Sequence, residues 1–169
     1  DCVAAGASFT LITSPTSHFV SLSEAARRAR KLNGDHFQFI AERALDQLPQ
    51  PDNQQYVRGC AAFAGFSPAA ANREAILDFS RRMETSLGGR WKEWGSEQVT
   101  SNWVVANAKK LGTIPYPKYR NYEGQPVATD TALLHFIGTF RFAGSGYTRM
   151  TRQVIGTMPD RPMAAVAAP

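Results

Sequence analysis

The residues best suited to chemistry lie in 133–142, which reads Leu-Leu-His-Phe-Ile-Gly-Thr-Phe-Arg-Phe. The apolar and aromatic content of residues 132–137 predicts a strand with His135 near its end. Gly138 would open a loop in which the backbone can approach a ligand closely. Arg141 adds a guanidinium that can bind two phosphate oxygens at once. Together these residues are suited to holding a diphosphate and its metal ion.

Each of these residues also has a simpler interpretation. A single histidine on an apolar strand is often a core or hydrogen-bonded residue, and a single arginine is often a surface cation. Because the spacing leaves both interpretations open, the rest of the chain has to provide the context.

Composition favours one folded domain. The chain has 169 residues, of which 43% are hydrophobic and 20% charged, so residues 1–160 can bury a core of their own. We expect the Ala- and Pro-rich residues 161–169 to form a disordered tail. No apolar run approaches the roughly 18 residues that span a bilayer, and no secretory signal is visible. Two distant cysteines do not suggest a disulfide framework, so a cytoplasmic location is expected.

The charge balance favours anionic partners. The formal net charge is +5, with basic clusters at residues 27–31, 81–82 and 109–110. Each cluster is typical of a solvated helix face, and no nucleic-acid-binding motif is present. We therefore do not expect nucleic acid as the main partner. A non-catalytic basic α/β module that binds nucleic acid or a protein partner remains the alternative function.

Helical and strand patterns alternate along the chain, which predicts an α/β fold with a mixed sheet flanked by helices. Ser21 and Glu24 have the spacing of a capping box, and Glu42 falls on the polar face of the second expected helix. The strands are expected over residues 7–13, 56–66, 113–116 and 132–137, the helices over residues 22–31, 36–48, 68–87, 97–108 and 147–158, and a loop over residues 117–130.

Three segments together resemble a known family. The segment from His135 to Arg141 resembles the His-x-x-Gly-x-x-Lys motif of the family-eight type of GT-A glycosyltransferases, with arginine in the place of lysine. Glu97-Gln98 is similar to that group's acidic-Gln pair at a helix start. The segment Arg58-Gly59-Cys60 is similar to its Asn-x-Gly strand, with arginine in the place of asparagine. The order and rough spacing agree, and the resemblance covers about residues 36–158, the C-terminal half of a GT-A fold.

The resemblance implies transfer of a sugar from a nucleotide-diphosphate donor to an acceptor hydroxyl of a carbohydrate or glycan. A divalent cation, Mn²⁺ or Mg²⁺, would bridge the two phosphates. His135 matches the motif histidine that binds this metal, while Gly138 and Arg141 match the positions that contact the donor diphosphate. A guanidinium there would offset charge on the departing diphosphate.

The other two segments are implied to serve the sugar and the acceptor. Glu97 and Gln98 are the expected catalytic pair, and Arg58, Gly59 and Cys60 are expected on the acceptor and sugar side. The simpler alternative for Glu97 is a first-turn carboxylate that offsets the helix dipole.

Two tryptophans precede the acidic-Gln pair. Trp91 and Trp94 either stack on a sugar ring or pack in the core.

One part of the family pattern is missing from these residues. The sequence contains no Asp-x-Asp pair, and the family's nucleotide-binding strands are also absent. We expect both to lie upstream of Asp1, which would make this chain an inactive fragment when isolated.

Overall fold

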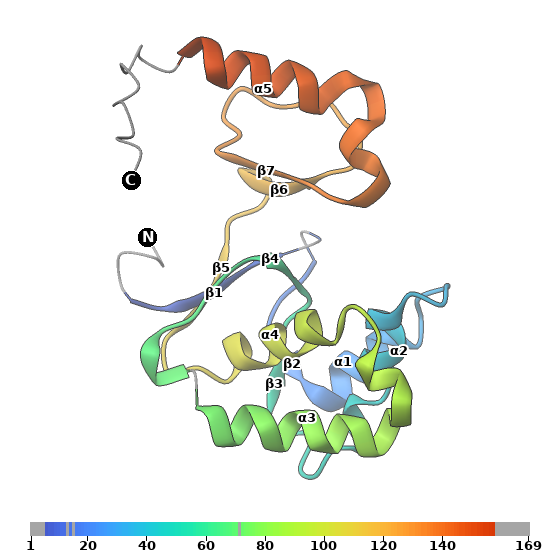
Figure 1. The fold of residues 1–169 in the computed structure, drawn as a ribbon. Coiled ribbons are helices and arrows are strands. Elements are labelled where there is room, and N and C mark those ends of the chain that lie inside the picture. The colour runs from blue at the N-terminus through green and yellow to red at the C-terminus, as the bar shows by residue number, and fades with distance from the viewer. Residues whose placement is uncertain (1–5, 13, 15, 71, 158–169) are drawn as a thin grey trace, which may run out of the picture.

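The computed structural model describes residues 6–157 except residues 13, 15 and 71 (Figure 1). The predicted tail at residues 161–169 and the end of the last predicted helix lie outside the described residues. The strands are β1 (Ser8–Ile12), β2 (Val20–Ser21), β3 (Gln55–Tyr56), β4 (Gly59–Gly65), β5 (Leu111–Ile114), β6 (Tyr119–Tyr122) and β7 (Leu133–Phe136). The α-helices are α1 (Leu22–Ala29), α2 (Phe37–Arg43), α3 (Arg73–Leu87), α4 (Ser96–Ala106) and α5 (Gly146–Thr157). Short 3-10 helices cover Leu45–Gln47, Pro68–Ala70, Gly88–Lys92 and Gly138–Ser145.

The main sheet has the order β4-β1-β5. Strand β1 pairs antiparallel with β4 and parallel with β5, so the sheet is mixed. The register between β1 and β4 shifts between Thr10 and Leu11, because Thr10 faces Ala64 while Leu11 faces Cys60. Such a bulge bends the strand locally. The prediction of an α/β fold with a mixed sheet is confirmed, and β5 lies at an edge of the sheet.

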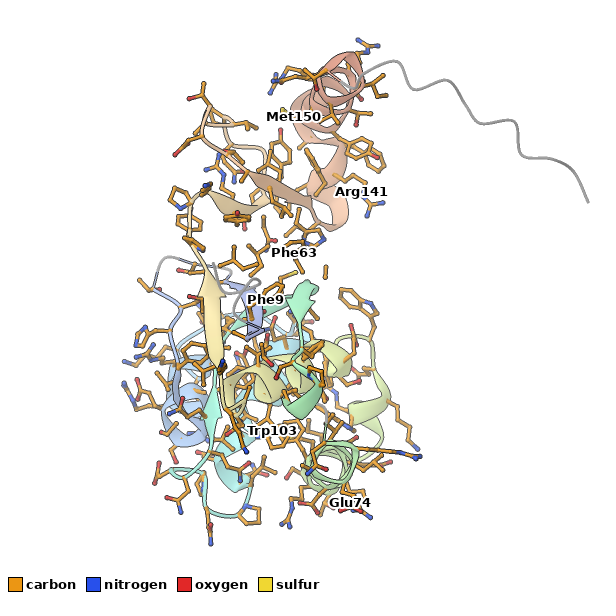
Figure 2. All side chains as sticks on the ribbon, turned by 90° about the vertical axis from the view of Figure 1, so that its left-hand side faces the viewer. Phe9, Phe63, Glu74, Trp103, Arg141 and Met150 are labelled. Carbon is orange, nitrogen blue, oxygen red and sulfur yellow. The ribbon has the colours of Figure 1, made fainter. Side chains whose placement is uncertain are left out.

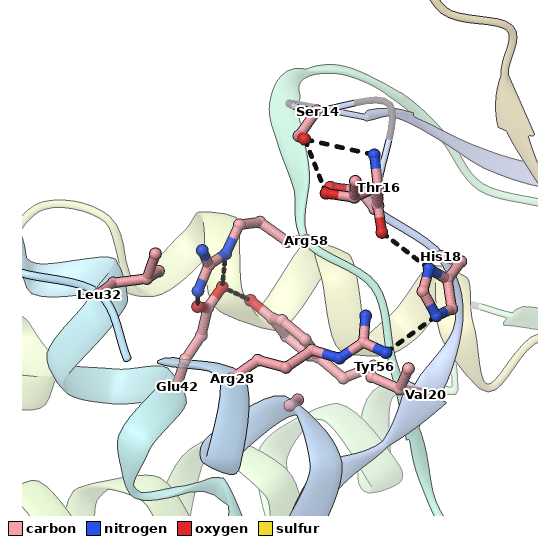
Figure 3. Close-up of a pocket in the computed structure, with 11 residues that line it drawn as sticks. Ser14, Thr16, His18, Val20, Arg28, Leu32, Glu42, Tyr56 and Arg58 are labelled. Atoms are coloured by element: carbon pink, nitrogen blue, oxygen red, sulfur yellow. Dashed lines mark hydrogen bonds and ion pairs between the residues drawn. The ribbon is translucent and has the colours of Figure 1, made fainter. Parts of the chain in front are cut away.

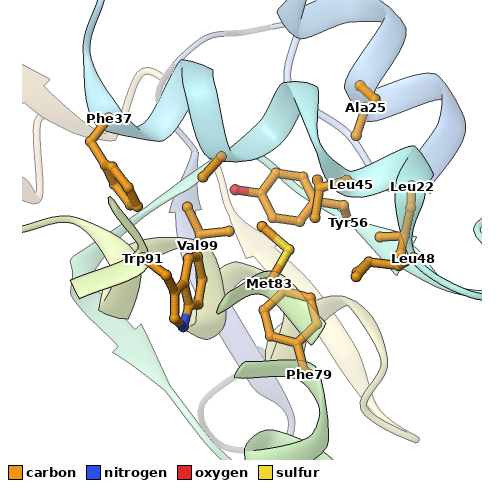
Figure 4. Close-up of a cluster of buried hydrophobic side chains, with 12 residues drawn as sticks. Leu22, Ala25, Phe37, Leu45, Leu48, Tyr56, Phe79, Met83, Trp91 and Val99 are labelled. Carbon is orange, nitrogen blue, oxygen red and sulfur yellow. The ribbon is translucent and has the colours of Figure 1, made fainter. Parts of the chain in front are cut away.

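The four helices α1 to α4 enclose the larger core, which Figure 4 shows in close-up. Phe79 and Met83 are buried on α3, as the spacing of its apolar residues predicts. Phe79 stacks on Trp103 with ring centroids 4.5 Å apart and an interplanar angle of 14°. Full burial of one such side chain contributes about 1.5–3 kcal/mol to folding, so this cluster anchors the helices.

Strands β6 and β7 form a separate parallel pair that packs with α5. Figure 1 shows this C-terminal unit on the far side of the main sheet from α3. In Figure 2, Phe9 and Phe63 lie on the side of the sheet that faces the unit, and their ring centroids are 6.1 Å apart. The His135 segment is therefore carried by this unit and not by the main sheet.

Local sequence signals explain several helix starts. The Ser21 side chain accepts a hydrogen bond from the backbone N–H of Glu24 at 3.2 Å, which confirms this half of the predicted capping box. Helix α3 begins later than predicted, because the Asn72 side chain accepts hydrogen bonds from the N–H groups of Glu74 and Ala75. Residues after Ser67 form only a 3-10 turn.

Two strand predictions need correction. The predicted strand over residues 56–66 is split into β3 and β4, with Val57 and Arg58 between them. Residues 119–122 form β6, although the sequence predicts a loop there. In Tyr119–Tyr122 two polar residues stand side by side between two tyrosines, so the segment lacks the alternation that predicts a strand.

Candidate functional site

Two of the three segments that resemble the glycosyltransferase motifs meet at β4, and the helix that carries the third contacts the same strand. Cys60 Sγ lies 3.4 Å from Nδ1 of His135, which belongs to the C-terminal unit. One residue earlier, the carbonyl oxygen of Gly59 accepts a hydrogen bond from Asn102 on α4, at 3.1 Å. Helix α4 begins with the segment that holds Glu97 and Gln98. The structure thus brings together residues that lie 75 positions apart in the sequence.

His135 is fixed by its neighbour in the parallel β6–β7 pair. Asn121 lies opposite His135 in the register, and its Oδ1 is 3.1 Å from Nδ1 of the imidazole. Because a carbonyl oxygen only accepts, Nδ1 carries the proton, and the neutral ring keeps a lone pair on Nε2. This nitrogen makes no hydrogen bond to any residue that the structure describes. Metal-binding histidines are commonly oriented in this way through their second nitrogen.

The surroundings of His135 favour its neutral form by lowering the pKa of the imidazole. Partial burial lowers the pKa of His135 below its ordinary value, and the positive charge of Arg141 lowers it further. A neutral imidazole is the form that can bind a metal or accept a proton.

Gly138 and Arg141 follow β7 in a 3-10 helix. Gly138 has a φ of +42°, a region that residues with a side chain rarely adopt, and a Cβ there would meet no atom within 4 Å. The backbone N–H of Arg141 donates to the carbonyl of Ile137 at 3.2 Å, and its side chain is exposed. Both motif positions are therefore open to a ligand.

Arg58 points to a carboxylate inside the protein, where it binds Glu42 (Figure 3). Its Nε donates to Oε1 of Glu42 at 3.1 Å, and its Nη2 donates to Oε2. The side chain of Glu42 is only 1% exposed, so the prediction that it lies on a solvated helix face is wrong. Burial lowers the pKa of the Arg58 guanidinium, which nevertheless stays charged.

A hydrogen-bond network extends from this ion pair. Oε1 of Glu42 also accepts hydrogen bonds from Gln38 and from the Tyr56 hydroxyl, each at 3.0 Å. Asn102 donates to the same hydroxyl at 3.3 Å, and Gln98 donates to Oε1 of Gln38 at 2.5 Å. Gln98 and Arg58 thus belong to one network. Sequence reasoning missed Gln38, Glu42 and Asn102 because nothing in the local pattern distinguishes them from surface residues.

Glu97 has a local role at the start of α4. Its Oε2 accepts a hydrogen bond from the backbone N–H of Gly95 at 2.9 Å, and the side chain is exposed. A carboxylate in the first helical turn also offsets the helix dipole.

The two nearby tryptophans differ sharply. Trp91 is buried in the core, and its indole N–H donates to Ser80 at 2.8 Å. Trp94 is 80% exposed, with its ring at an edge-on angle to His36. Only Trp94 can therefore offer an aromatic face to a ligand.

The donor set around His135 does not fit Mn²⁺ or Mg²⁺ by itself. The described part of the chain contains no group of three or more His, Cys, Asp or Glu that could hold a metal ion. Beside His135 stand an amide and a thiol, and burial raises the pKa of the Cys60 thiol. Both ions prefer carboxylate, water and phosphate oxygens. The predicted metal would need carboxylates from outside the described residues.

Comparison with known protein families, with curated proteins and with solved structures gave no match. In the part of the chain that the structure describes, no helix is long and apolar enough to cross a membrane. The arguments below therefore rest on the residues and their geometry.

Proposed function

We propose that this chain is the C-terminal part of a GT-A glycosyltransferase, which transfers a sugar from a nucleotide-diphosphate donor to an acceptor hydroxyl. The observation that carries the proposal is the contact between His135 and Cys60, which joins two motif-like segments 75 positions apart. Helix α4, which carries Glu97 and Gln98, reaches the same strand through Asn102, whose side chain donates to the carbonyl of Gly59. Glu97 and Gln98 themselves bond to Gly95 and Gln38.

The donor diphosphate is proposed to bind at the end of β7. His135 presents Nε2, Gly138 leaves space beside the backbone, and Arg141 supplies a positive charge close enough to lower the pKa of His135. A guanidinium there can bind two phosphate oxygens and stabilise the leaving diphosphate. No step is assigned to a metal ion, which remains a prediction.

The sugar and acceptor are proposed to lie toward the start of α4. Exposed Trp94 offers a ring on which a sugar can stack, and exposed Glu97 lies in the first turn of the same helix. Gly59 and Cys60 are buried on β4, where they contact Asn102 and His135, whereas Arg58 is engaged by Glu42. Arg58 is therefore proposed to position the neighbouring strand and not to contact the acceptor.

The alternative of a basic binding module has less support. Several arginines of the basic clusters form ion pairs with carboxylates of their own surface, among them Arg27, Arg28 and Arg30. These pairs reduce the charge available to a polyanion.

The test is calorimetric titration of uridine diphosphate with Mn²⁺ into the complete protein, including any residues encoded upstream of Asp1. His135→Ala should weaken binding at least about tenfold, as expected for loss of a ligand or its orienting group. His36→Asn is the matched control, because it removes an exposed imidazole while keeping a side chain that can cap α2.

Unchanged affinity in His135→Ala would remove the main support for the proposal. Binding of nucleic acid that needs no divalent ion and weakens steeply with salt would favour the basic module instead.

A further inference from the structure

A cavity of about 360 Å³ lies beside the Glu42–Arg58 pair. Figure 3 shows it bordered by Ser14, Thr16, His18 and Val20, by Arg28 of α1 and by Arg58. Its volume falls in the range of small-molecule sites, about 300–1,000 Å³. Hydroxyls, an imidazole, the Glu42 carboxylate and two guanidinium groups line it, with a few aliphatic side chains.

Arg58 has unused hydrogen-bond donors at this cavity. Glu42 engages Nε and Nη2, while Nη1 makes no hydrogen bond to any described residue. The guanidinium is held further by its position over the Phe39 ring, 5.2 Å from the centroid. A fixed cation with a free edge is prepared to bind an acceptor without losing much side-chain freedom.

The guanidinium of Arg28, which also lines the cavity, is likewise held by neighbouring side chains. Its Nε donates to Glu24 at 2.6 Å, and its Nη2 lies 2.9 Å from Nε2 of His18. Nδ1 of His18 lies 2.7 Å from the carbonyl oxygen of Thr16 and must donate to it, so Nε2 is free to accept from Arg28. Nη1 of Arg28 makes no hydrogen bond within the described residues.

Most of the unused hydrogen-bonding capacity of the charged groups at this cavity belongs to the two guanidinium groups. Oε1 of Glu42 accepts from Gln38, Tyr56 and Arg58 and Oε2 accepts from Arg58, while the lone pair of His18 is taken by Arg28. The hydroxyls of Ser14 and Thr16 bond to each other at 2.9 Å and can turn toward a ligand. A ligand rich in acceptors is required to satisfy two guanidinium edges.

We propose that this cavity binds a phosphate or carboxylate group of a small polar ligand, held between Arg28 and Arg58. This site goes beyond the sugar-transfer proposal and does not depend on it, because it uses neither His135 nor Arg141. The shared chemistry is an oxyanion, whether free or carried on a sugar.

The chain has three histidines, of which His18 alone lines the cavity, so His18 is a specific NMR reporter. We would titrate inorganic phosphate, glucose 6-phosphate and glucuronate, with glucose as the neutral control, at constant ionic strength. The pH is held constant throughout the titrations. The His18 ring signals should shift and saturate with at least one anion, while the signals of His36 and His135 stay in place.

A matched pair of variants distinguishes specific anion binding in the cavity from non-specific attraction of anions to the basic surface. Arg27 and Arg28 both bind Glu24, but only Arg28 lines the cavity. Arg28→Gln should weaken anion binding at least about tenfold by calorimetry, as loss of a charge-assisted hydrogen bond would, and Arg27→Gln should change it less than about twofold.

The outcomes are distinct. Saturation by phosphate alone supports the site with a free anion as its ligand, and saturation by glucose 6-phosphate or glucuronate supports a sugar-borne one. Equal losses in the two variants, binding of glucose, or no saturable His18 shift with any anion would overturn the proposal. Failure at His18 would leave the His135 experiment unaffected, so the two proposals fail separately.

Discussion

The Glu42–Arg58 network and the His135 cluster differ in how completely their polar atoms are used. In the network, both oxygens of a carboxylate that is 1% exposed are occupied by protein donors. In the cluster, His135 uses Nδ1 for Asn121 and keeps Nε2 without a described partner. Saturated buried charge stabilises and orients a structure, whereas an oriented atom with a free lone pair is available for a ligand. The contrast distinguishes a positioning role from a binding role.

The parts of the molecule that carry them differ too. The network lies against the helices α1 to α4 and their continuous core. The C-terminal unit instead exposes several large apolar side chains, including Phe142 at 76% and Ile155 at 63%. Such exposure marks a surface with less internal packing. A perturbation in the network should therefore affect global stability, and one in the cluster should act locally.

The largest expected effect tests the network. Arg58→Met leaves the buried Glu42 carboxylate without its cation and should lower the free energy of unfolding by about 3–5 kcal/mol. Urea denaturation followed by circular dichroism measures this. Arg82→Met is the control, because it breaks an exposed pair with Asp78 and should cost less than about 1 kcal/mol. Equal losses of unfolding free energy in the two variants would mean that the buried ion pair contributes no more to stability than the exposed one.

A smaller effect is expected where the network touches β4. A Cβ at Gly59 would overlap the Thr10 side chain and lie 2.9 Å from Oδ1 of Asn102. Gly59→Ala should therefore cost about 1–3 kcal/mol in denaturant unfolding. In Gly89→Ala the new methyl meets nothing within 4 Å, and stability should change by less than about 0.5 kcal/mol. A neutral Gly59→Ala would show that β4 and α4 are not in close contact.

The smallest effect concerns protonation in the cluster. Because the charge of Arg141 helps to lower the pKa of His135, Arg141→Gln should raise that pKa, as an NMR pH titration of the ring would show. The lowered pKa favours the neutral ring in the folded state. The contribution of His135 to stability is therefore fully present at pH values above its pKa in the unfolded chain, about 6.5. It is lost as the pH falls through the pKa of His135 in the folded protein.

The Arg141→Gln variant should therefore lose less stability on mild acidification than the parent protein. Arg149→Gln, which removes an exposed charge from α5, serves as the control. If both variants titrate like the parent, Arg141 does not act on the imidazole and the proposed diphosphate site loses its cation.

Local patterns were enough to predict much of the fold. Ser21 caps α1 as its spacing with Glu24 predicts, and the apolar stripe of α3 is buried at Phe79 and Met83. Both signals arise from residues within a few positions of each other, where helix geometry alone fixes which side chains meet.

Long-range pairing could not be predicted in the same way. Glu42 lies on α2 and its partner Arg58 follows 16 positions later, between β3 and β4, so a helical wheel places Glu42 in solvent. The sequence predicts Asn121 in a loop, because the four residues of β6 do not alternate between apolar and polar. The motif residues can be proposed from the sequence, but the partners that orient them appear only once the chain is folded.

The position of β1 has a consequence for how the protein is made. This early strand is central in the sheet, yet one neighbour begins only at Gly59 and the other only at Leu111. Synthesis at the ribosome runs at about 5–20 residues per second. Several seconds therefore pass between the synthesis of Leu11 and Ile12 and that of the two strands that pair with them. Newly made chains should therefore depend on protection of this segment until β5 has emerged.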